Sequence, residues 1–296
     1  MSLSRTANRR IAVLAFSLPT LLLFTIIVIY PLSRTLMMSG FRWDGMTPGT
    51  FIGIDNFQRL IRDPLFITSL RNCLIFAAAM TIYQLGFGTI FTLIFIDGMV
   101  KGKTLLRKSY FIPVVLSVTV VCQLWLSIFN AEFGLLNTLF NVFGIDYQQE
   151  WLSSMGLSSI LTIAFVSSWQ GMGYQLTLLY AGARSIPTEI YEAARIDGAS
   201  SFKLHRNITI PLMAETYRIC LIFTLTAGLN AFAHMQIMTR GGPGTSTFTL
   251  TFMMYRAAFQ TFEYGYACAV AVVLVVICLL VTLTINRFVA RERVVY

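Results

Sequence analysis

The chain has 296 residues, of which 56% are hydrophobic and 12% are charged, and its formal net charge is +9. Its mean hydropathy is +0.71, whereas a soluble domain usually carries about 25% charged residues. A fold of this size could not remove so much apolar surface from water. The composition therefore excludes an ordinary soluble domain and predicts an all-α protein that crosses a lipid membrane several times.

Uncharged apolar runs predict six membrane-spanning helices, because about 20 such residues cover the hydrocarbon core of a bilayer. They are residues 11–33, 72–96, 109–131, a core within 151–183, 219–239 and 264–286. The first run is too long for a cleaved signal peptide. Residues 133–145 are uncharged but too short to cross, and we interpret them as an interfacial or tucked helix. A single transmembrane domain, residues 11–290, then lies between terminal segments 1–10 and 291–296.

The charges orient this bundle, since six spans place both termini on one side. That side carries 15 of the 22 basic residues and six acids, and the other side carries seven of each. The whole excess of +9 lies on one side, which the positive-inside rule makes cytoplasmic. The sequence predicts a multi-pass protein of a prokaryotic cell membrane with both termini in the cytoplasm. The basic residues reflect topology and anionic lipid headgroups, and do not imply nucleic acid.

The fourth span has a polar middle, "SSWQGMGYQ". Ser167, Gln170, Gly171 and Tyr174 are three or four residues apart, which places them on one helical face. Polar side chains usually face another helix or a cavity, because lipid contact is costly. For any one position, helix packing and substrate contact are equally good explanations. The middles of the six spans carry no charge, which favours a neutral, hydroxyl-rich substrate such as a sugar over an ion.

The largest cytoplasmic connection, residues 184–211, joins spans four and five. Pro187 suits a first helical turn, and Gly198 suits a helix end that needs a left-handed residue. Ser200 or Ser201 can cap a second short helix, and Pro211 can open the fifth span. A passive connector would need only a few turn residues. The pattern of helix, glycine turn and helix therefore favours a docking element for a protein partner.

The same stretch, "EAARIDGASSFKLHRNITIPL", resembles the EAA signature of permease subunits of binding-protein-dependent ABC importers. Glu192, Ala193, Ala194 and Gly198 match the signature, and Ile210 stands where leucine is usual. Three further stretches resemble this family in the same order along the chain. They are "GIDNFQRLIRDPLFITSLRNCLIF", "SIFNAEFGLLNTLFNVFG" and "MTRGGPGTST". Together they point to the carbohydrate-importing branch and to the MalF-like one of its two permease types.

This resemblance implies the type I importer permease fold, with residues 184–211 acting as the coupling loop that docks on a cytoplasmic ATPase. The implied docking residues are Glu192, Ala193, Ala194, Asp197 and Gly198. The implied partners are a second homologous permease, two ATP-binding subunits and an extracytoplasmic solute-binding protein. ATP and Mg²⁺ would bind to the ATPase subunits, so no cofactor or metal is expected in this chain.

The resemblance also implies which residues line the path of the sugar. The implied lining in the fourth and fifth spans is Ser167, Gln170, Gly171, Tyr174, Ala227, Gly228, Asn230 and Ala231. In the maltose-type pattern, larger aromatic and amide side chains occupy the fifth-span positions, which are Ala227, Gly228 and Ala231 here, with Asn230 adjacent. The small residues here predict a roomier cavity, or one whose polar contacts come from the partner permease.

Other functions fit the sequence less well. The nearest phosphate-loop pattern, "GMVKGKT" at residues 98–104, has three residues between its glycines where four are needed, and no strand precedes it. His205 and His234 have no nucleophile or orienting partner in sequence that would indicate catalysis. Importers of a non-sugar solute such as glycerol phosphate remain an alternative. An ion-coupled secondary transporter would need intramembrane acids and inverted repeats, and a plain scaffold would not explain the EAA stretch.

Overall fold

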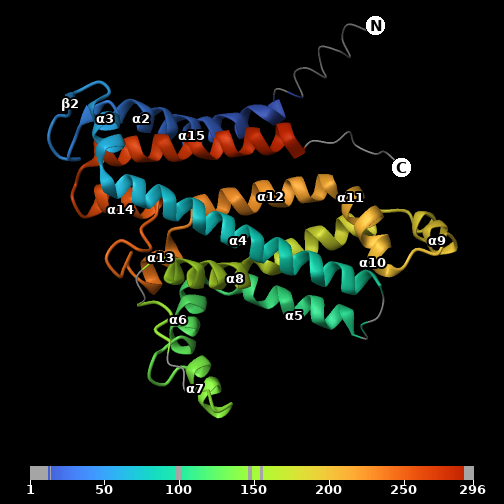
Figure 1. The fold of residues 1–296 in the computed structure, drawn as a ribbon. Helices are drawn as coiled ribbons and strands as arrows, with labels where there is room; N and C mark the ends of the chain where they lie inside the picture. Colours follow the sequence, from blue (N-terminus) through green and yellow to red (C-terminus); the bar gives the residue numbers. More distant parts are fainter. Residues whose placement is uncertain are drawn as a thin grey trace, which may run out of the picture. The chain divides into compact units, whose positions relative to one another are not determined.

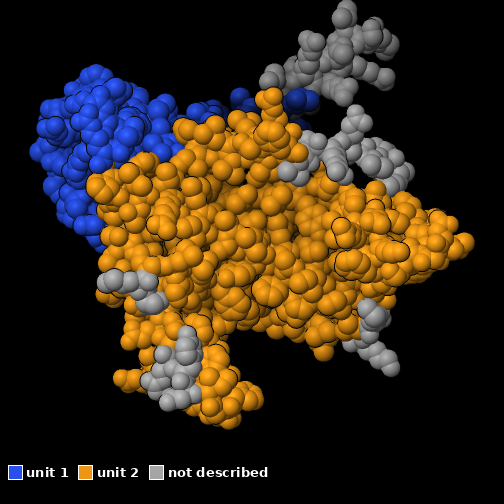
Figure 2. Space-filling view, in the orientation of Figure 1, with its two compact units in different colours: residues 1–62, 254–273 blue, residues 63–253, 274–296 orange. Residues whose placement is uncertain are grey.

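The computed structural model describes residues 13, 15–97, 100, 102–145, 149–153 and 156–289. Nearly all its regular elements are helices (Figure 1). The chain forms two compact units (Figure 2). Unit 1 comprises residues 1–62 and 254–273, and unit 2 comprises residues 63–253 and 274–296. The predicted cytoplasmic ends, residues 1–10 and 291–296, lie outside the described residues.

Unit 1 begins with an apolar helix over residues 15–38, which passes through a π-helical stretch, Thr25–Ile29, into α2, Tyr30–Met38. None of its most apolar window is buried within the chain. Large side chains such as Phe16 and Ile27 are therefore left for lipid or another subunit. This helix is close to the predicted first span and ends five residues later.

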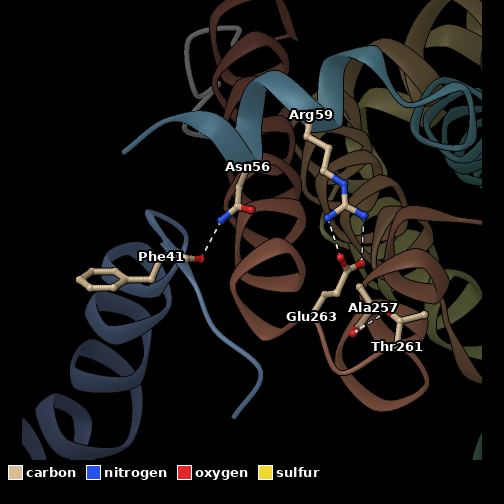
Figure 3. Close-up of polar contacts among 6 residues, drawn as sticks. All are labelled: Phe41, Asn56, Arg59, Ala257, Thr261 and Glu263. Atoms are coloured by element: carbon tan, nitrogen blue, oxygen red, sulfur yellow. Dashed lines mark hydrogen bonds and ion pairs between the residues drawn. The ribbon is translucent and has the colours of Figure 1, made fainter. Parts of the chain in front are cut away.

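A small hairpin follows, which the all-α prediction did not include. β1 (Phe41–Arg42) pairs antiparallel with β2 (Thr50–Phe51). The buried amide of Asn56, in α3 (Asp55–Arg62), donates to the carbonyls of Ser39 and Phe41 at 2.8 and 2.9 Å. In Figure 3, this amide points from α3 toward Phe41. The side chain thus satisfies backbone carbonyls where the chain leaves the first helix.

Unit 2 is built around α4, a 33-residue helix from Pro64 to Ile96. It starts eight residues before the predicted second span. The Asp63 carboxylate accepts a hydrogen bond from the backbone N–H of Leu65 at 2.8 Å, and Pro64 occupies the first turn. Such an N-cap followed by proline is a strong helix start. The extra turns include polar residues and Arg71, so they lie outside the uncharged apolar run that predicted the span.

Helix α4 packs along α8 (Leu157–Arg184) and α12 (Ala214–Leu229). Glycines allow these backbones to approach closely. A Cβ atom added at Gly228 of α12 would lie 2.6 Å from Cα of Ala77 in α4. The Thr81 hydroxyl donates to the Thr224 hydroxyl at 3.2 Å across the same contact. Small residues and hydroxyl bonds are the usual means of helix association in lipid.

The predicted third span, residues 109–131, is not one continuous helix. α5 (Lys103–Val115) ends after Pro113, and α6 (Val118–Ile128) starts at an angle of 101° to it. Between them, Leu116 and Ser117 have extended backbones, and the Ser117 hydroxyl caps α6 by accepting from the N–H of Val120. Hydrophobicity alone could not predict this break, because the sequence around it is apolar on both sides.

The predicted fifth span, residues 219–239, is also interrupted. α12 starts five residues earlier than predicted and ends at Leu229, and α13 (Ala233–Met238) follows after a short gap. Ahead of α12, the helix Ser201–Leu212 comprises α10 (Ser201–Leu204), a π-helix (His205–Thr209) and α11 (Ile210–Leu212), and it meets α12 at 68°. Pro211 therefore lies before the bend.

Three further helices are α7, α14 and α15. α7 (Leu135–Val142) is the short helix expected within residues 133–145. α14 (Leu250–Phe259) was not predicted. α15 (Tyr264–Val289) begins at the residue predicted for the sixth span.

Among the described residues, three helices are both long and apolar enough to cross a membrane, and the count rises to five if each bent pair is one span. The three are residues 15–38, 64–96 and 264–288. α8 has 28 residues and sufficient length, but it is not among them because of its polar middle. The six-span arrangement therefore stays a prediction.

Candidate coupling loop and substrate path

The predicted docking stretch forms an exposed helix with a defined end. α9 (Thr188–Ile196) protrudes at one end of unit 2 (Figure 1, right). Gly198 has φ +76°, and the N–H of Ala199 donates to the carbonyl of Ala194 at 2.9 Å. This is the glycine-terminated helix end that the sequence predicted. Pro187 lies immediately before α9 and has an extended backbone.

The two alanines of the EAA stretch point in different directions. Ala194 is buried, whereas Glu192 and Ala193 are exposed, as are Asp197 and Gly198. Ala194 belongs to an apolar cluster that we call the loop core. Its buried members are Leu179, Ala183, Ile186, Tyr191, Ala194, Leu204, Met213 and Cys220. α9 is thus fixed to the ends of α8 and α12 by its inner face, and its outer face is free for a partner.

A buried polar contact connects the loop to a third helix. Nε2 of His205 lies 2.9 Å from Oδ1 of Asp97, the residue that ends α4. Nδ1 of the same ring lies 3.1 Å from the Thr209 hydroxyl. His205 is 7% exposed and Thr209 is fully buried. The two residues lie at the ends of the π-helical stretch, an irregularity that is frequent at functional sites.

A cavity of about 300 Å³ adjoins this contact. Its walls come from the end of α4, the end of α8 and both helices of the loop. They include Asp97, Arg184, Tyr191, Arg195 and His205. The packing at this end of unit 2 therefore leaves unfilled space between the loop and the end of α4.

Three of the predicted path residues face α4 and are used in helix packing. The Ser167 hydroxyl donates to the sulfur of Met80 at 3.6 Å. A Cβ atom at Gly171 would lie 2.5 Å from the amide nitrogen of Gln84. Gly228 fits against α4 as described above. These contacts fit the packing explanation for the three positions.

Other predicted path residues form an exposed strip on α8 and α12. Tyr174 is 48% exposed, and its ring lies 6.3 Å from that of Phe223, which is itself half exposed. Ala227 is exposed one turn after Phe223, and Asn230 is exposed at the end of α12. We call these four residues the open strip. It presents two aromatic rings, a small residue and an amide.

Gln170 lies one turn before Tyr174 and bonds at both ends of its amide. Its nitrogen donates to the carbonyl of Leu116 at 3.0 Å, in the break between α5 and α6. Its oxygen lies 3.1 Å from Nε2 of His234 in α13. Gln170 therefore satisfies a carbonyl exposed by the break and also positions the imidazole. The last predicted path residue, Ala231, is partly buried, and its carbonyl accepts from the hydroxyls of Thr249 and Thr251.

Several neighbours of these residues were not predicted from the sequence. Phe111 packs edge-on against Tyr174 with ring centroids 5.7 Å apart, and Phe223 flanks its other side. Asp97 lies at the end of α4, and its contact with His205 spans 108 residues of sequence. An aspartate directly after an apolar run was the available signal, but a single sequence does not show which residue it meets.

Unit 1 contains a larger cavity, of about 590 Å³, whose lining includes Arg42, Trp43, Asp55, Arg59 and Tyr266. The guanidinium of Arg59 bonds both carboxylate oxygens of Glu263, at 2.6 and 3.1 Å (Figure 3). It also lies 4.4 Å from the centre of the Tyr266 ring. Two charged groups in the wall of this cavity are therefore paired with each other.

Asp44 lies in the loop between the two strands. Hydrogen bonds from the backbone N–H groups of Thr47 and Met46 hold the pKa of its carboxyl below the usual value. This side chain is therefore a structural part of the loop. Within the described part of the chain, no three histidine, cysteine or acidic side chains are grouped to hold a metal ion.

Comparisons with known proteins agree with the architecture. The family model for the inner membrane component of binding-protein-dependent transport systems matches residues 98–294. A solved bacterial ABC transporter involved in the import of the acidic polysaccharide alginate has a chain with the same fold. Its TM-score is 0.81 at 21% identity, and all of both chains is covered.

Relatives in sequence cover nearly the whole chain. The probable ABC transporter permease protein YurN of Bacillus subtilis is 35% identical over 270 residues, which are 90% of this chain and 92% of the relative. The multiple sugar-binding transport system permease protein MsmF of Streptococcus mutans is 31% identical over 256 residues, with 86% and 87% covered.

Proposed function

The chain belongs to the family of inner membrane components of binding-protein-dependent transport systems, and we propose that it forms half of an alternating-access path for a sugar. The substrate class follows from the relatives, because the name of MsmF specifies sugars. An oligosaccharide delivered by an extracytoplasmic binding protein fits this class best. The other half of the path would come from a second, homologous permease.

The observation that carries this proposal is the geometry of the coupling loop. Its exposed helix, α9, is anchored to the ends of α8 and α12 through the loop core. A partner that binds the outer face of α9 could therefore move both helices together. We assign this partner as an ATP-binding subunit, one of two in the complex, which would hold ATP and Mg²⁺. The chain itself would act as a permease and not as an enzyme.

The docking contacts on this chain would come from Glu192, Ala193, Asp197 and Gly198, which are exposed. Glu192 supplies a charge, and Ala193 allows another surface to approach closely. Ala194 would contribute from the inner face by fixing the helix in place. This division of roles among the five predicted docking residues follows from their burial.

The open strip is our candidate for the sugar path. Sugars are recognised by aromatic faces together with hydrogen-bonding groups. Tyr174 and Phe223 provide the aromatic faces, and Asn230 provides an acceptor through its side-chain carbonyl, since its amide nitrogen donates to the Thr226 carbonyl. Ala227 leaves room beside them. Gln170 would support the strip, while Ser167, Gly171 and Gly228 would fix α8 and α12 on α4. Ala231 would support the path through its backbone carbonyl, which accepts hydrogen bonds from Thr249 and Thr251.

The proposed location is the cytoplasmic membrane of a prokaryote, with six spans and both termini in the cytoplasm. The apolar helix of residues 15–38 supports a membrane position, since none of its most apolar window is buried within the chain.

Uptake measurements test the function. A strain that lacks this chain is supplied with a panel of labelled oligosaccharides, with glycerol phosphate as the non-sugar arm. We expect loss of uptake for at least one oligosaccharide, restored by the chain, and no change for glycerol phosphate. Loss of glycerol phosphate uptake alone would support the alternative. Unchanged uptake of every solute tested would contradict a role as an importer permease.

A further inference from the structure

The contact between His205 and Asp97 joins two parts of unit 2 that are not continuous in the chain. The coupling loop is covalently continuous with α8 on one side and with α12 on the other. α4 has no such connection to the loop. Yet α4 packs along both α8 and α12, so any rearrangement of the bundle must involve all three helices.

We propose that His205 and Asp97 form a tether through which the coupling loop moves α4. His205 is then a positioning residue, which acts on α4 through Asp97. This proposal rests on the proposed function, because it assumes that the loop docks on an ATPase. It adds two residues whose role is to transmit movement after docking: His205, which lies in the EAA stretch but is not one of the five predicted docking residues, and Asp97 at the end of α4.

The local chemistry supports a specific bond. With a proton on Nε2, the ring donates to the Asp97 carboxylate, and Nδ1 accepts from the Thr209 hydroxyl. Both ring nitrogens are then satisfied, and the side chains of His205 and Asp97 are largely buried, at 9% and 13% exposed. Hydrogen bonds to a carboxylate are short and strong in such surroundings. The bond can thus resist displacement of the loop relative to α4.

The surroundings also allow movement. The cavity of about 300 Å³ lies against both residues of the tether. The helix that carries His205 joins α12 at a bend of 68°. An apolar contact also attaches α4 to the loop, since Ile96 of α4 packs on the loop core. The loop can therefore pivot at the bend while the tether pulls on the end of α4.

Two substitutions of His205 separate the two bonds of the ring. A glutamine amide reaches approximately the position of Nε2, so His205→Gln keeps a donor for Asp97. An asparagine amide reaches approximately the position of Nδ1, so His205→Asn keeps the bond to Thr209 and loses Asp97. Both replacements are polar and similar in size. Asp97→Ala removes the tether from the other side. Glu215→Ala is the control, because Glu215 pairs with Arg218 within α12 alone.

The experiment uses the full complex with its second permease, ATPase subunits and binding protein in proteoliposomes. The readouts are the amount of ATPase subunit that co-purifies, and the ratio of ATP hydrolysis with and without sugar-loaded binding protein. We expect His205→Asn and Asp97→Ala to lower this ratio about fivefold or more, at the lower end of typical coupling between sites. His205→Gln and Glu215→Ala should stay close to the unmodified ratio, and all variants should bind the ATPase normally.

Three results would overturn the tether. The first is equal ratios for the asparagine and glutamine variants, which would show that the bond to Asp97 is not used. The second is a loss of co-purified ATPase in proportion to the loss of activity, which would show a role in assembly only. The third is the absence of stimulation in the unmodified complex, which would refute the proposed function itself and the tether with it.

Discussion

At the scale of single residues, exposure divides the polar and small side chains of α8 and α12 into two groups. Ser167, Gly171 and Gly228 pack against α4. Tyr174, Ala227 and Asn230 are exposed. A common helical face was predicted for part of this set, but the sequence could not show which side of that face meets α4. The division follows from where α4 lies, which depends on contacts between residues far apart in the chain.

Tyr174 provides the clearest test of the sugar path. We predict that Tyr174→Ala lowers sugar uptake about five- to tenfold, because an aromatic contact contributes about 1 kcal/mol. Leu178→Ala, one turn further along α8, is the control, since Leu178 is 40% exposed and Tyr174 is 48% exposed. The measurement is initial uptake rate over a series of sugar concentrations. Equal rates for both variants and the unmodified chain would remove Tyr174 from the path.

Gln170→Ala should also weaken uptake, because it would disturb both the sugar path and the packing around it. The substitution leaves the Leu116 carbonyl and the His234 ring without their amide partner. Each lost bond costs about 0.5–1.5 kcal/mol, so the break between α5 and α6 would be disturbed along with the path. A fall in the unfolding temperature of the purified chain should accompany the loss of uptake.

Gly228 tests the close packing of α12 on α4. We predict that Gly228→Ala lowers stability by about 1–3 kcal/mol, because the added Cβ would lie 2.6 Å from a backbone atom of α4. Gly86→Ala in α4 is the matched control, since a Cβ there meets nothing within 4 Å. Thermal unfolding of the detergent-solubilised chain measures both. A Gly228→Ala chain as stable as Gly86→Ala would show that the two helices can separate at no cost.

At the scale of elements, a helix end could be predicted from the sequence where a local cap or turn residue determines it. Gly198 ends α9 in the left-handed conformation, as its position after the helix predicted. Asp63 and Pro64 form a cap and first turn of the same local kind at the start of α4, although this start was not predicted because it precedes the apolar run. The breaks at Leu116 and after Leu229 were not predicted. Each lies inside a long uncharged run with only one polar residue at the break, Ser117 in the first and Asn230 in the second. In the first case the free carbonyl of Leu116 is satisfied by Gln170, 54 residues away.

The exposed face of α9 makes a prediction about coupling. Glu192→Lys reverses a charge on the outer face without touching the loop core, so it should lower sugar-stimulated ATP hydrolysis while the chain still inserts. Gly198→Val should act similarly, since a β-branched residue at φ +76° costs about 1 kcal/mol or more. Gly198→Asn is the control, because asparagine tolerates this conformation. Normal transport by both Glu192→Lys and Gly198→Val would refute docking at α9.

At the scale of the whole molecule, the charge asymmetry predicts which surfaces face the cytoplasm. In a cysteine-free background, single cysteines at Ser2, Lys103 and Ser201 should resist impermeant thiol reagents added to intact cells. A cysteine at Thr47, in the loop between the strands, should react. Lys103, Ser201 and Thr47 are all exposed in the structure, so a failure to react reports sidedness and not burial. Labelling of Lys103 or Ser201 from outside would overturn the topology.

The central claim is that this chain couples sugar movement to ATP hydrolysis in another subunit through its loop of residues 184–211. The most direct test measures both quantities together in proteoliposomes that contain the full complex, for the unmodified chain and for Glu192→Lys. We predict that sugar-loaded binding protein stimulates ATP hydrolysis and uptake in the unmodified complex, and that Glu192→Lys reduces both by a similar factor. Uptake that continues at the unmodified rate while ATP hydrolysis is lost would contradict the claim.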